Sequence, residues 1–275
     1  MRTSIIPRLA GVVALTLVTA GPLRADVRPV EDLPPDMVQA LGRAMYDQDR
    51  YAAQATDLLF REKGGPQRLA QEGLRGDWVV TRVKDATVVR FLREVNGAMV
   101  VAYDVVFPPA QLPQVQRPAD GRVSEAALAQ LRARHLAMEQ VRDECSERYN
   151  TIVLQRSPDA NFLVYALAAT SDPDQIVIGG HYRVTISPDG RKVVKTDKLY
   201  STCLNLPAKN DNGAVPYLTH LVSARPLETH AYMSLLYQRP FYVGVGKSVW
   251  KIEKGAVTPV EQPKQAKTAA APTSP

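Results

Sequence analysis

The sequence predicts an α+β fold, in which a largely antiparallel sheet packs against an N-terminal helix and a second helix. A segment with apolar residues at helical spacing precedes three strand-like runs, and a second such segment precedes many more strands. The links between strands are short, suit antiparallel neighbours and leave no room for crossover helices. With 275 residues, of which 45% are hydrophobic, the chain is large enough to bury a core.

The clearest local signal is a hairpin in the second half of the chain. Two strand-like runs, Ile176–Ile186 and Arg191–Tyr200, flank the turn Ser187-Pro188-Asp189-Gly190. Pro188 presets φ for a β-turn, and Gly190 tolerates a left-handed backbone. The first run alternates between two faces, which predicts a sheet with one buried face. The residues of these faces are Tyr182, Val184 and Ile186 on one side and His181, Arg183 and Thr185 on the other.

An N-terminal helix is predicted after Pro34-Pro35, with Asp36 as its N-cap. Apolar residues recur at steps of three and four between Met37 and Leu59, and Gly64-Gly65 ends the pattern. The pattern fits one long helix or two shorter helices broken near residues 47–49. In both cases its apolar face is expected to pack on a sheet.

A meander of three strands is predicted next. Its strands are Trp78–Val83, Thr87–Val95 and Ala98–Phe107, and Asn96-Gly97 forms the turn between the last two. Several prolines then predict an irregular connection, which makes residues 108–123 a candidate subdivision of the domain.

A second helix is predicted from Ser124, its N-cap, to about Arg142. Its apolar stripe includes His135, which we expect at the edge of the core, and continues to Cys145, which we expect against the sheet. Turn clusters separate the remaining strands. Besides the hairpin, these strands are expected at Thr151–Gln155, Asn161–Thr170, Val215–Val222, Leu227–Tyr237, Phe241–Val245 and Val249–Glu253.

Both ends of the chain are expected to lie outside a single domain at residues 26–257. Residues 1–25 have the basic start, apolar stretch and small residues of a secretory signal peptide, with cleavage after Ala20 or Ala25. A retained membrane anchor is the alternative, but this apolar run is short for a bilayer core of roughly 30 Å. Residues 258–275 combine prolines with little apolar surface, so this tail is expected to be disordered.

Charge and composition restrict the partners. The signal peptide contains Arg2, Arg8 and Arg24, so cleavage changes the net charge from +6 to +3, with 31 basic and 28 acidic residues left. This charge is too small and too evenly spread to indicate nucleic acid. The leader and the Ala, Arg and Val-rich composition predict a bacterial periplasmic protein, without a membrane span once the leader is removed.

The two cysteines, Cys145 and Cys203, both remain after signal cleavage. In an oxidising compartment an even pair is more often a disulfide than two free thiols, so we predict that they are joined. A redox or metal-binding role would normally use the close spacing Cys-x-x-Cys, which the chain lacks.

Histidines offer one catalytic hypothesis. On the predicted strand Leu227–Tyr237, Glu228 and His230 share a face about 7 Å apart. If another strand brings His181 or His220 alongside, the group can bind a metal ion and support a metal-assisted hydrolase. The same pattern is common for cross-strand and solvent-facing side chains, so we assign no metal and no cofactor.

Two other enzyme classes fit poorly. His230 and Ser234 would be about 13 Å apart in a strand, too far for a base and its nucleophile. Gly246-Lys247-Ser248 resembles the end of a phosphate-binding loop, but Phe241 stands where the first glycine belongs. We therefore interpret the tripeptide as a hairpin turn.

Aromatic residues concentrate near the C-terminus, and they supply the candidate binding residues Tyr232, Tyr237, Phe241, Tyr242 and Trp250. They can line a ligand groove or a partner surface, and they can equally form an aromatic core. The function expected from the sequence is that of an exported, non-catalytic envelope protein that binds a partner protein or a small ligand. The metal-assisted hydrolase is the alternative.

Overall fold

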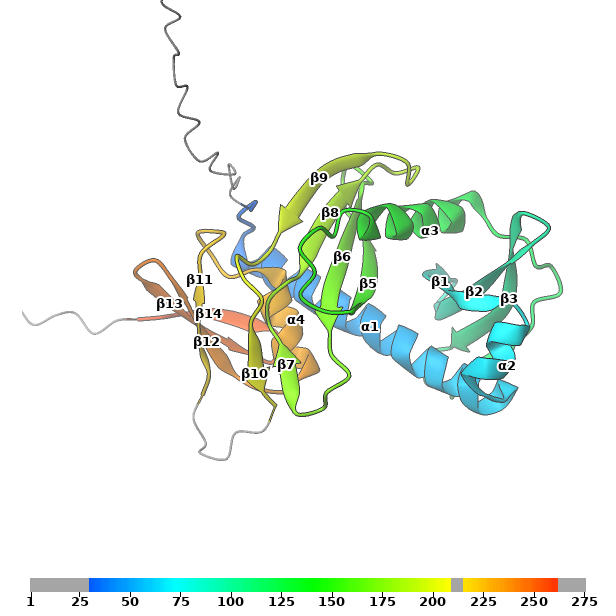
Figure 1. Ribbon diagram of the computed structural model, residues 1–275, viewed down its shortest axis with the longest axis horizontal. Helices are drawn as coiled ribbons and strands as arrows, with labels where there is room; N and C mark the ends of the chain where they lie inside the picture. Colours follow the sequence, from blue (N-terminus) through cyan, green and yellow to red (C-terminus); the bar gives the residue numbers. More distant parts are fainter. Residues whose placement is uncertain (1–29, 209–214, 262–275) are drawn as a thin grey trace, which may run out of the picture.

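The structure is a computed structural model that describes residues 30–208 and 215–261 (Figure 1). It confirms the predicted α+β class, with helices packed on mainly antiparallel sheets. The helices are α1 (Pro35–Lys63), α2 (Gly65–Gln71), α3 (Glu125–Met138) and α4 (Glu228–Leu236). The strands are β1 (Leu74–Val83), β2 (Ala86–Val95), β3 (Ala98–Phe107), β4 (Gln114–Gln116), β5 (Arg148–Gln155), β6 (Phe162–Ala169), β7 (Gln175–Val177), β8 (Tyr182–Ile186), β9 (Val193–Lys198), β10 (Asn205–Pro207), β11 (Tyr217–His220), β12 (Phe241–Val245), β13 (Ser248–Glu253) and β14 (Ala256–Val260).

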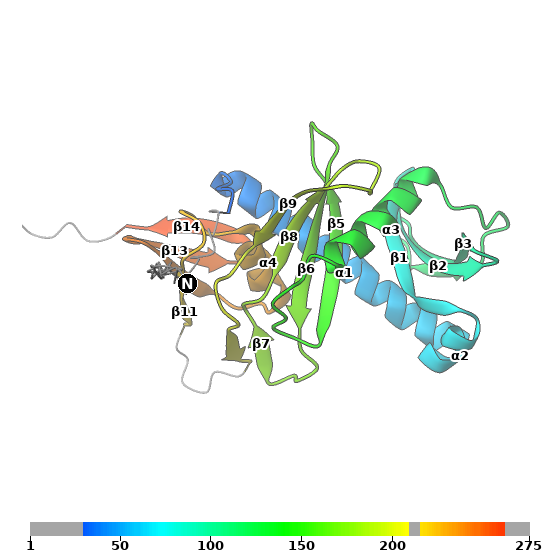
Figure 2. The same ribbon diagram turned by 45° about the horizontal axis from the view of Figure 1, so that its top comes forward.

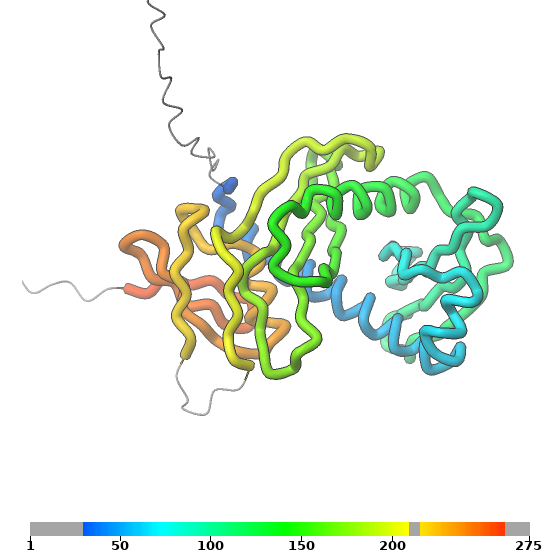
Figure 3. Tube along the Cα trace, in the orientation of Figure 1, coloured from blue at the N-terminus to red at the C-terminus, as the bar shows by residue number. Residues whose placement is uncertain are grey.

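Helix α1 connects two parts of the molecule, which Figure 3 shows along the chain trace. One part contains α2 and the sheet β1-β2-β3-β4, and the other contains the sheets β5-β6-β8-β9 and β11-β12-β13-β14. Near its start α1 contributes Val38 and Met45 to the larger core. Near its end it contributes Ala55, Leu58 and Leu59 to the core under β1–β4. Helix α3 also packs on both parts, so the two helices together hold the parts in place.

The sequence left open one helix or two, and the structure has one unbroken α1. Its N-cap is Pro34, and the predicted cap Asp36 lies in the first turn instead. Pro35 is favourable at the first helical position, because a backbone N–H there would have no hydrogen-bond partner within the helix. Gly64 ends the helix in the left-handed conformation, at φ 87, and its N–H donates to the Phe60 carbonyl.

Helix α3 and the meander β1–β2–β3 are both present where the sequence predicts a helix and three strands. Ser124 caps α3 by accepting a hydrogen bond from the Ala127 N–H. The helix ends at Met138, before the expected Arg142. His135 is not at the core edge: its side chain is 55% exposed, and Nε2 lies 2.8 Å from Asp77 Oδ1.

The sheet β5-β6-β8-β9 is covered on both faces. Figures 1 and 2 show α3 on one side of it and α1 on the other. On the α3 side Val184 and Ile186 pack against Ala129 and Ala133. All five residues of β8 are buried, so the expectation of a single buried face is wrong. The predicted hairpin is formed by β8 and β9, whereas β7 leaves the run to pair with β10.

Residues 227–237 correct the sequence analysis, because they form α4 and not a strand. Every residue from Glu228 to Ser234 is buried, so the segment has no polar face to mark its period. Helix α4 crosses α1 closely at Gly42, where an added Cβ would lie 2.5 Å from Ala231 Cβ. The last sheet also contains a parallel pair, β11 with β12.

The expected chain ends are only partly described. Residues Thr258–Val260 belong to β14 and pair with β13, so the folded part extends past the expected boundary at residue 257. The signal peptide predicted at residues 1–25 and the tail residues 262–275 lie outside the described residues. Within residues 30–208 and 215–261, none of the helices has the length and hydropathy of a membrane span.

Candidate functional site

The structure brings the three histidines of the catalytic hypothesis together around Tyr200. His181 precedes β8, His220 ends β11 and His230 lies in the first turn of α4. The ring centroids of these histidines lie 5.6, 5.8 and 5.4 Å from that of Tyr200, in edge-to-face arrangements. The three histidines named in the catalytic hypothesis thus lie close together, but His230 belongs to helix α4 and not to the predicted strand.

These imidazoles are buried and each has a defined partner. Nδ1 of His181 accepts from the Ala168 N–H, and Nδ1 of His230 accepts from the Leu227 N–H. His220 Nε2 lies 2.5 Å from Ser223 Oγ. Burial lowers the pKa of His181 and of His220 to about 4, and it lowers the pKa of His230 well below its usual value. All three rings are neutral at pH 7.

The cluster does not have the geometry of a metal site. His220 and His230 meet edge to face, with their ring centroids 5.0 Å apart. Glu228, the fourth residue of the hypothesis, does not join them, because its carboxylate binds Arg183. Within the described ranges no group of three or more His, Cys, Asp and Glu side chains is arranged to hold a metal ion.

Glu228 instead belongs to a buried charge cluster at the centre of the sheet. Arg183 lies 2.7 Å from Glu228 and 2.9 Å from Asp197, and the Tyr165 hydroxyl donates to Glu228. The Arg183 side chain is 2% exposed and that of Glu228 is 0% exposed. Burial alone would lower the pKa of Arg183, but the negative charges of Glu228 and Asp197 raise it. The cluster joins β8 to α4, and the burial of Arg183 and Glu228 keeps both side chains out of reach of a substrate.

Sequence reasoning missed Arg183 as a structural residue. The available signal was its position in the middle of a mostly apolar strand, where a charge must find a partner.

The distance argument against Ser234 as a nucleophile assumed a strand, and it no longer applies on helix α4. On a helix His230 and Ser234 are one turn apart, but Ser234 Oγ donates to the Ala231 carbonyl and accepts from the Gly255 N–H. The serine is thus engaged by backbone and not by His230.

The five candidate aromatic residues do not form one surface. Phe241 belongs to the main core, and Trp250 packs against it. Tyr242 is half-buried on β12. Tyr232 and Tyr237 line a cavity of about 280 Å³ together with His181, and Tyr237 and Phe241 line a second, smaller cavity. The Tyr232 hydroxyl is 3.0 Å from the Asp49 carboxylate, so this side chain also fixes α4 to α1.

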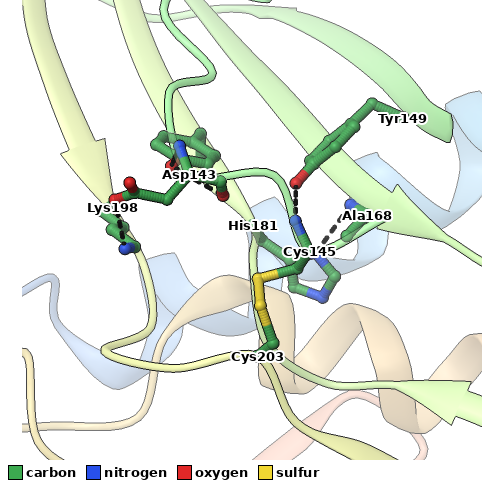
Figure 4. Close-up of a disulfide and its surroundings, with 8 residues drawn as sticks. Asp143, Cys145, Tyr149, Ala168, His181, Lys198 and Cys203 are labelled. Carbon is green, nitrogen blue, oxygen red and sulfur yellow. Dashed lines mark hydrogen bonds and ion pairs between the residues drawn. A yellow bond between two sulfur atoms is a disulfide. The ribbon is translucent and has the colours of Figure 1, made fainter. Parts of the chain in front are cut away.

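The predicted disulfide is present, with Cα atoms of Cys145 and Cys203 5.4 Å apart. Figure 4 shows it next to His181, with the Cys145 N–H donating to the Tyr149 hydroxyl. Gly180 packs directly against the bond, because a Cβ there would lie 2.6 Å from Cys145 Sγ. The disulfide therefore fixes the loop in front of β8 that positions His181.

The sequence analysis did not predict a further open site, which is larger than the cavity at Tyr232 and Tyr237. It is a groove of about 710 Å³, here called the α1/α3 groove. Its lining comes from five elements, which explains why no sequence pattern marks it. Its lining residues are Ala44, Asp47, Gln48 and Tyr51 of α1, Val80 to Val83 of β1, Thr87 and Arg90 of β2, Ser124, Ala126, Ala127 and Gln130 at the start of α3, and Val153 to Gln155 of β5.

The α1/α3 groove lies between two sheet edges, since β1 and β5 are each the outer strand of their sheet. Gln48 covers one of these edges: its amide donates to the Val153 carbonyl and accepts from the Val153 N–H. The groove also receives Thr81, whose Oγ1 is buried and has no hydrogen-bond partner in the described structure. Its lining is mixed in polarity, as expected for a binding site.

The sequence matches no family model, and comparisons with curated proteins and with solved structures found no match, so the functional assignment rests on the geometry of the site.

Proposed function

We propose that the protein is an exported, non-catalytic protein of the bacterial periplasm that binds a partner protein or a small ligand in the α1/α3 groove. The observation that carries this proposal is the groove itself, about 710 Å³ in volume and lined from both parts of the molecule. This volume lies within the range of roughly 300–1,000 Å³ that is typical of ligand sites.

The disulfide supports an oxidising compartment, because such bonds persist mainly in exported proteins. It agrees with the signal peptide expected at residues 1–25. The small cavity at Tyr232 and Tyr237 is a weaker candidate, since its volume of about 280 Å³ is less than half that of the groove.

The metal-assisted hydrolase receives less support. A hydrolase needs its metal and base in a site that substrate can enter, but His181 and His220 are 3% exposed and His230 is 0% exposed. Glu228 is neutralised by Arg183 and is therefore not available as a metal ligand.

Site-specific photo-crosslinking tests the proposal in cells that express the full chain. A crosslinking amino acid replaces Gln130, which lines the groove, or Leu221, which is 74% exposed and is not among the groove-lining residues. We expect a discrete adduct from position 130 that is missing from position 221. A further Ala126→Trp substitution fills the groove and should remove the adduct without lowering the melting temperature. Equal adducts from both positions, or no adduct from position 130, would contradict the proposal.

A further inference from the structure

The outer edge of β1 presents free backbone groups to the α1/α3 groove. Strand β1 pairs with β2 only, with Val83 opposite Ala86 across a two-residue turn. In such a hairpin the flanking residues form a hydrogen-bonded pair, and the pairs then alternate along the ladder. The backbone groups of Thr81 and Val83 therefore face β2, whereas those of Val80 and Arg82 point away from it. No described backbone group bonds to this outer edge.

Other backbone groups on the outer edges of β5 and β1 are hydrogen-bonded by side chains, in contrast to those of Val80 and Arg82. On β5 the Gln48 side chain satisfies both backbone groups of Val153. On β1 itself Arg134 donates to the carbonyl of Trp78, at a distance of 3.1 Å. Proteins commonly cover or charge exposed strand edges to prevent unwanted pairing. Here the cover stops where β1 enters the groove, at Val80 and Arg82.

We propose that the ligand of the α1/α3 groove is an extended segment of a partner polypeptide, which adds as a strand to the outer edge of β1. This inference rests on the proposed function and specifies its ligand. Main-chain hydrogen bonds to Val80 and Arg82 supply affinity, as in other cases of strand addition. Thr81 Oγ1 is a further polar group without a partner in the described structure.

The charge of Arg82 indicates what type of side chain the partner segment carries at this position. Arg90, the other groove arginine, is already paired with Asp104 at 3.2 Å. Arg82 is exposed, and its guanidinium donates only to the Asp85 carbonyl among the described residues. A carboxylate on the added strand next to Arg82 would form a favourable cross-strand pair. The expected partner segment is thus extended and acidic.

The test uses two substitutions of one exposed residue. Arg82→Ala removes the charge but keeps the outward N–H, whereas Arg82→Pro removes both. Proline is tolerated on an edge strand where its nitrogen faces outward, so the ladder to β2 is retained. The probe is a display library of random peptides about ten residues long, enough for one strand, selected on the full wild-type protein.

The selected peptides should be acidic, and Arg82→Ala should weaken them severalfold in a salt-dependent manner. Arg82→Pro should weaken them about tenfold more, because one main-chain hydrogen bond is lost. Equal affinities of the two variants, or no enriched peptide, would overturn strand addition. If the crosslink at position 130 persists in that case, the groove function stands and only its ligand class is wrong.

Hydrogen exchange gives a second measurement that does not depend on the folding of the proline variant. On the wild-type protein a bound peptide should protect the amides of Val80 and Arg82, while that of Thr81 is protected with or without it. Unchanged exchange at Val80 and Arg82 would refute the inference.

Sedimentation analysis tests whether a second copy of the chain occupies the edge of β1. A wild-type dimer that Arg82→Pro converts to a monomer would show that a second copy, and not a partner, occupies this edge.

Discussion

The Arg183 guanidinium lies 2.7 Å from the Glu228 carboxylate, and this contact joins the central strand of one sheet to the first turn of α4. Both side chains are buried, and Asp197 binds the same guanidinium from β9. Buried charges are stable only when they are paired, because each charge loses its hydration on burial, and Asp197 is also paired with Lys195 at 2.8 Å. The contact therefore fixes where α4, and with it His230, sits on the sheet.

Arg183→Met should strongly destabilise the protein. It leaves Glu228 buried without its counter-ion, whereas Asp197 keeps its ion pair with Lys195, and breaking a buried pair typically lowers the free energy of unfolding by about 3–5 kcal/mol. Urea denaturation of the purified protein measures this change. As a control, Lys251→Gln removes an exposed ion pair with Glu253 and should have little effect. Similar stabilities of Arg183→Met and Lys251→Gln would show that the cluster is not structural.

The buried histidines should make stability depend on pH. The unfolded chain binds protons at imidazoles near pH 6.5, whereas burial delays protonation of folded His181 and His220 to about pH 4. Between these values the unfolded state holds more protons, so the free energy of unfolding falls as the pH is lowered. For His181 alone the loss between about pH 7 and about pH 5 is roughly 2 kcal/mol.

His181→Gln should therefore flatten the pH dependence of the free energy of unfolding, even though it lowers stability at pH 7 by removing buried hydrogen bonds. Tyr200→Phe is the matched control, because it alters the same cluster and keeps all three imidazoles. Urea denaturation at several pH values measures both slopes. An unchanged slope in His181→Gln would mean that the folded protein protonates this residue as readily as the unfolded chain.

The elements that could be predicted from the sequence are those with one-sided patterns or strong turn residues. Apolar spacing along α1, the Ser124 cap and the Asn96-Gly97 turn each act locally, so α1, α3 and the β2–β3 hairpin follow from a few neighbouring residues. The Cys145–Cys203 pair could be predicted from number and compartment alone.

Other features depend on contacts that no local pattern encodes. Helix α4 is buried on every side, so its residues show neither a helical stripe nor a true strand alternation. The α1/α3 groove requires Gln48, Arg82, Gln130 and Gln155 to meet, and these residues are far apart in the chain. The histidines could be chosen as candidate ligands from their residue type. Their burial around Tyr200 could not be predicted, because it depends on the contact between His220 of β11 and His230 of α4.

Loss of the disulfide should destabilise the protein and disturb His181. Closing a loop with a sequence separation of 58 residues restricts the unfolded chain, which corresponds to about 4 kcal/mol in the chain-entropy model. Cys145→Ala with Cys203→Ala should lower the urea midpoint accordingly. Gly180→Ala should impair formation of the bond, because Gly180 has φ 82 and no room for a Cβ beside Cys145. Alkylation and mass spectrometry count the free thiols.

Gly97→Ala is the control for that experiment, since Gly97 also has positive φ but meets nothing within 4 Å. Both alanines strain the backbone, and only the one at Gly180 contacts the disulfide. Free thiols should therefore appear in Gly180→Ala and not in Gly97→Ala. Complete oxidation of both variants would show that the loop before β8 adapts to a side chain.

Gln48 should act as the cover of the β5 edge. Its amide makes two hydrogen bonds with the backbone of Val153, at 2.9 and 2.8 Å. Gln48→Ala removes both hydrogen bonds to the partly buried N–H and carbonyl of Val153, which should lower the free energy of unfolding by about 1–3 kcal/mol. The uncovered edge can then pair with another chain, so sedimentation velocity should show more self-association than in the wild type.

Asp47→Ala is the control, because it changes the neighbouring groove residue but leaves both hydrogen bonds of Gln48 intact. It should show neither effect. If Gln48→Ala matched Asp47→Ala in both measurements, Gln48 would not protect β5, and the contrast between a covered β5 edge and a free β1 edge would lose its basis.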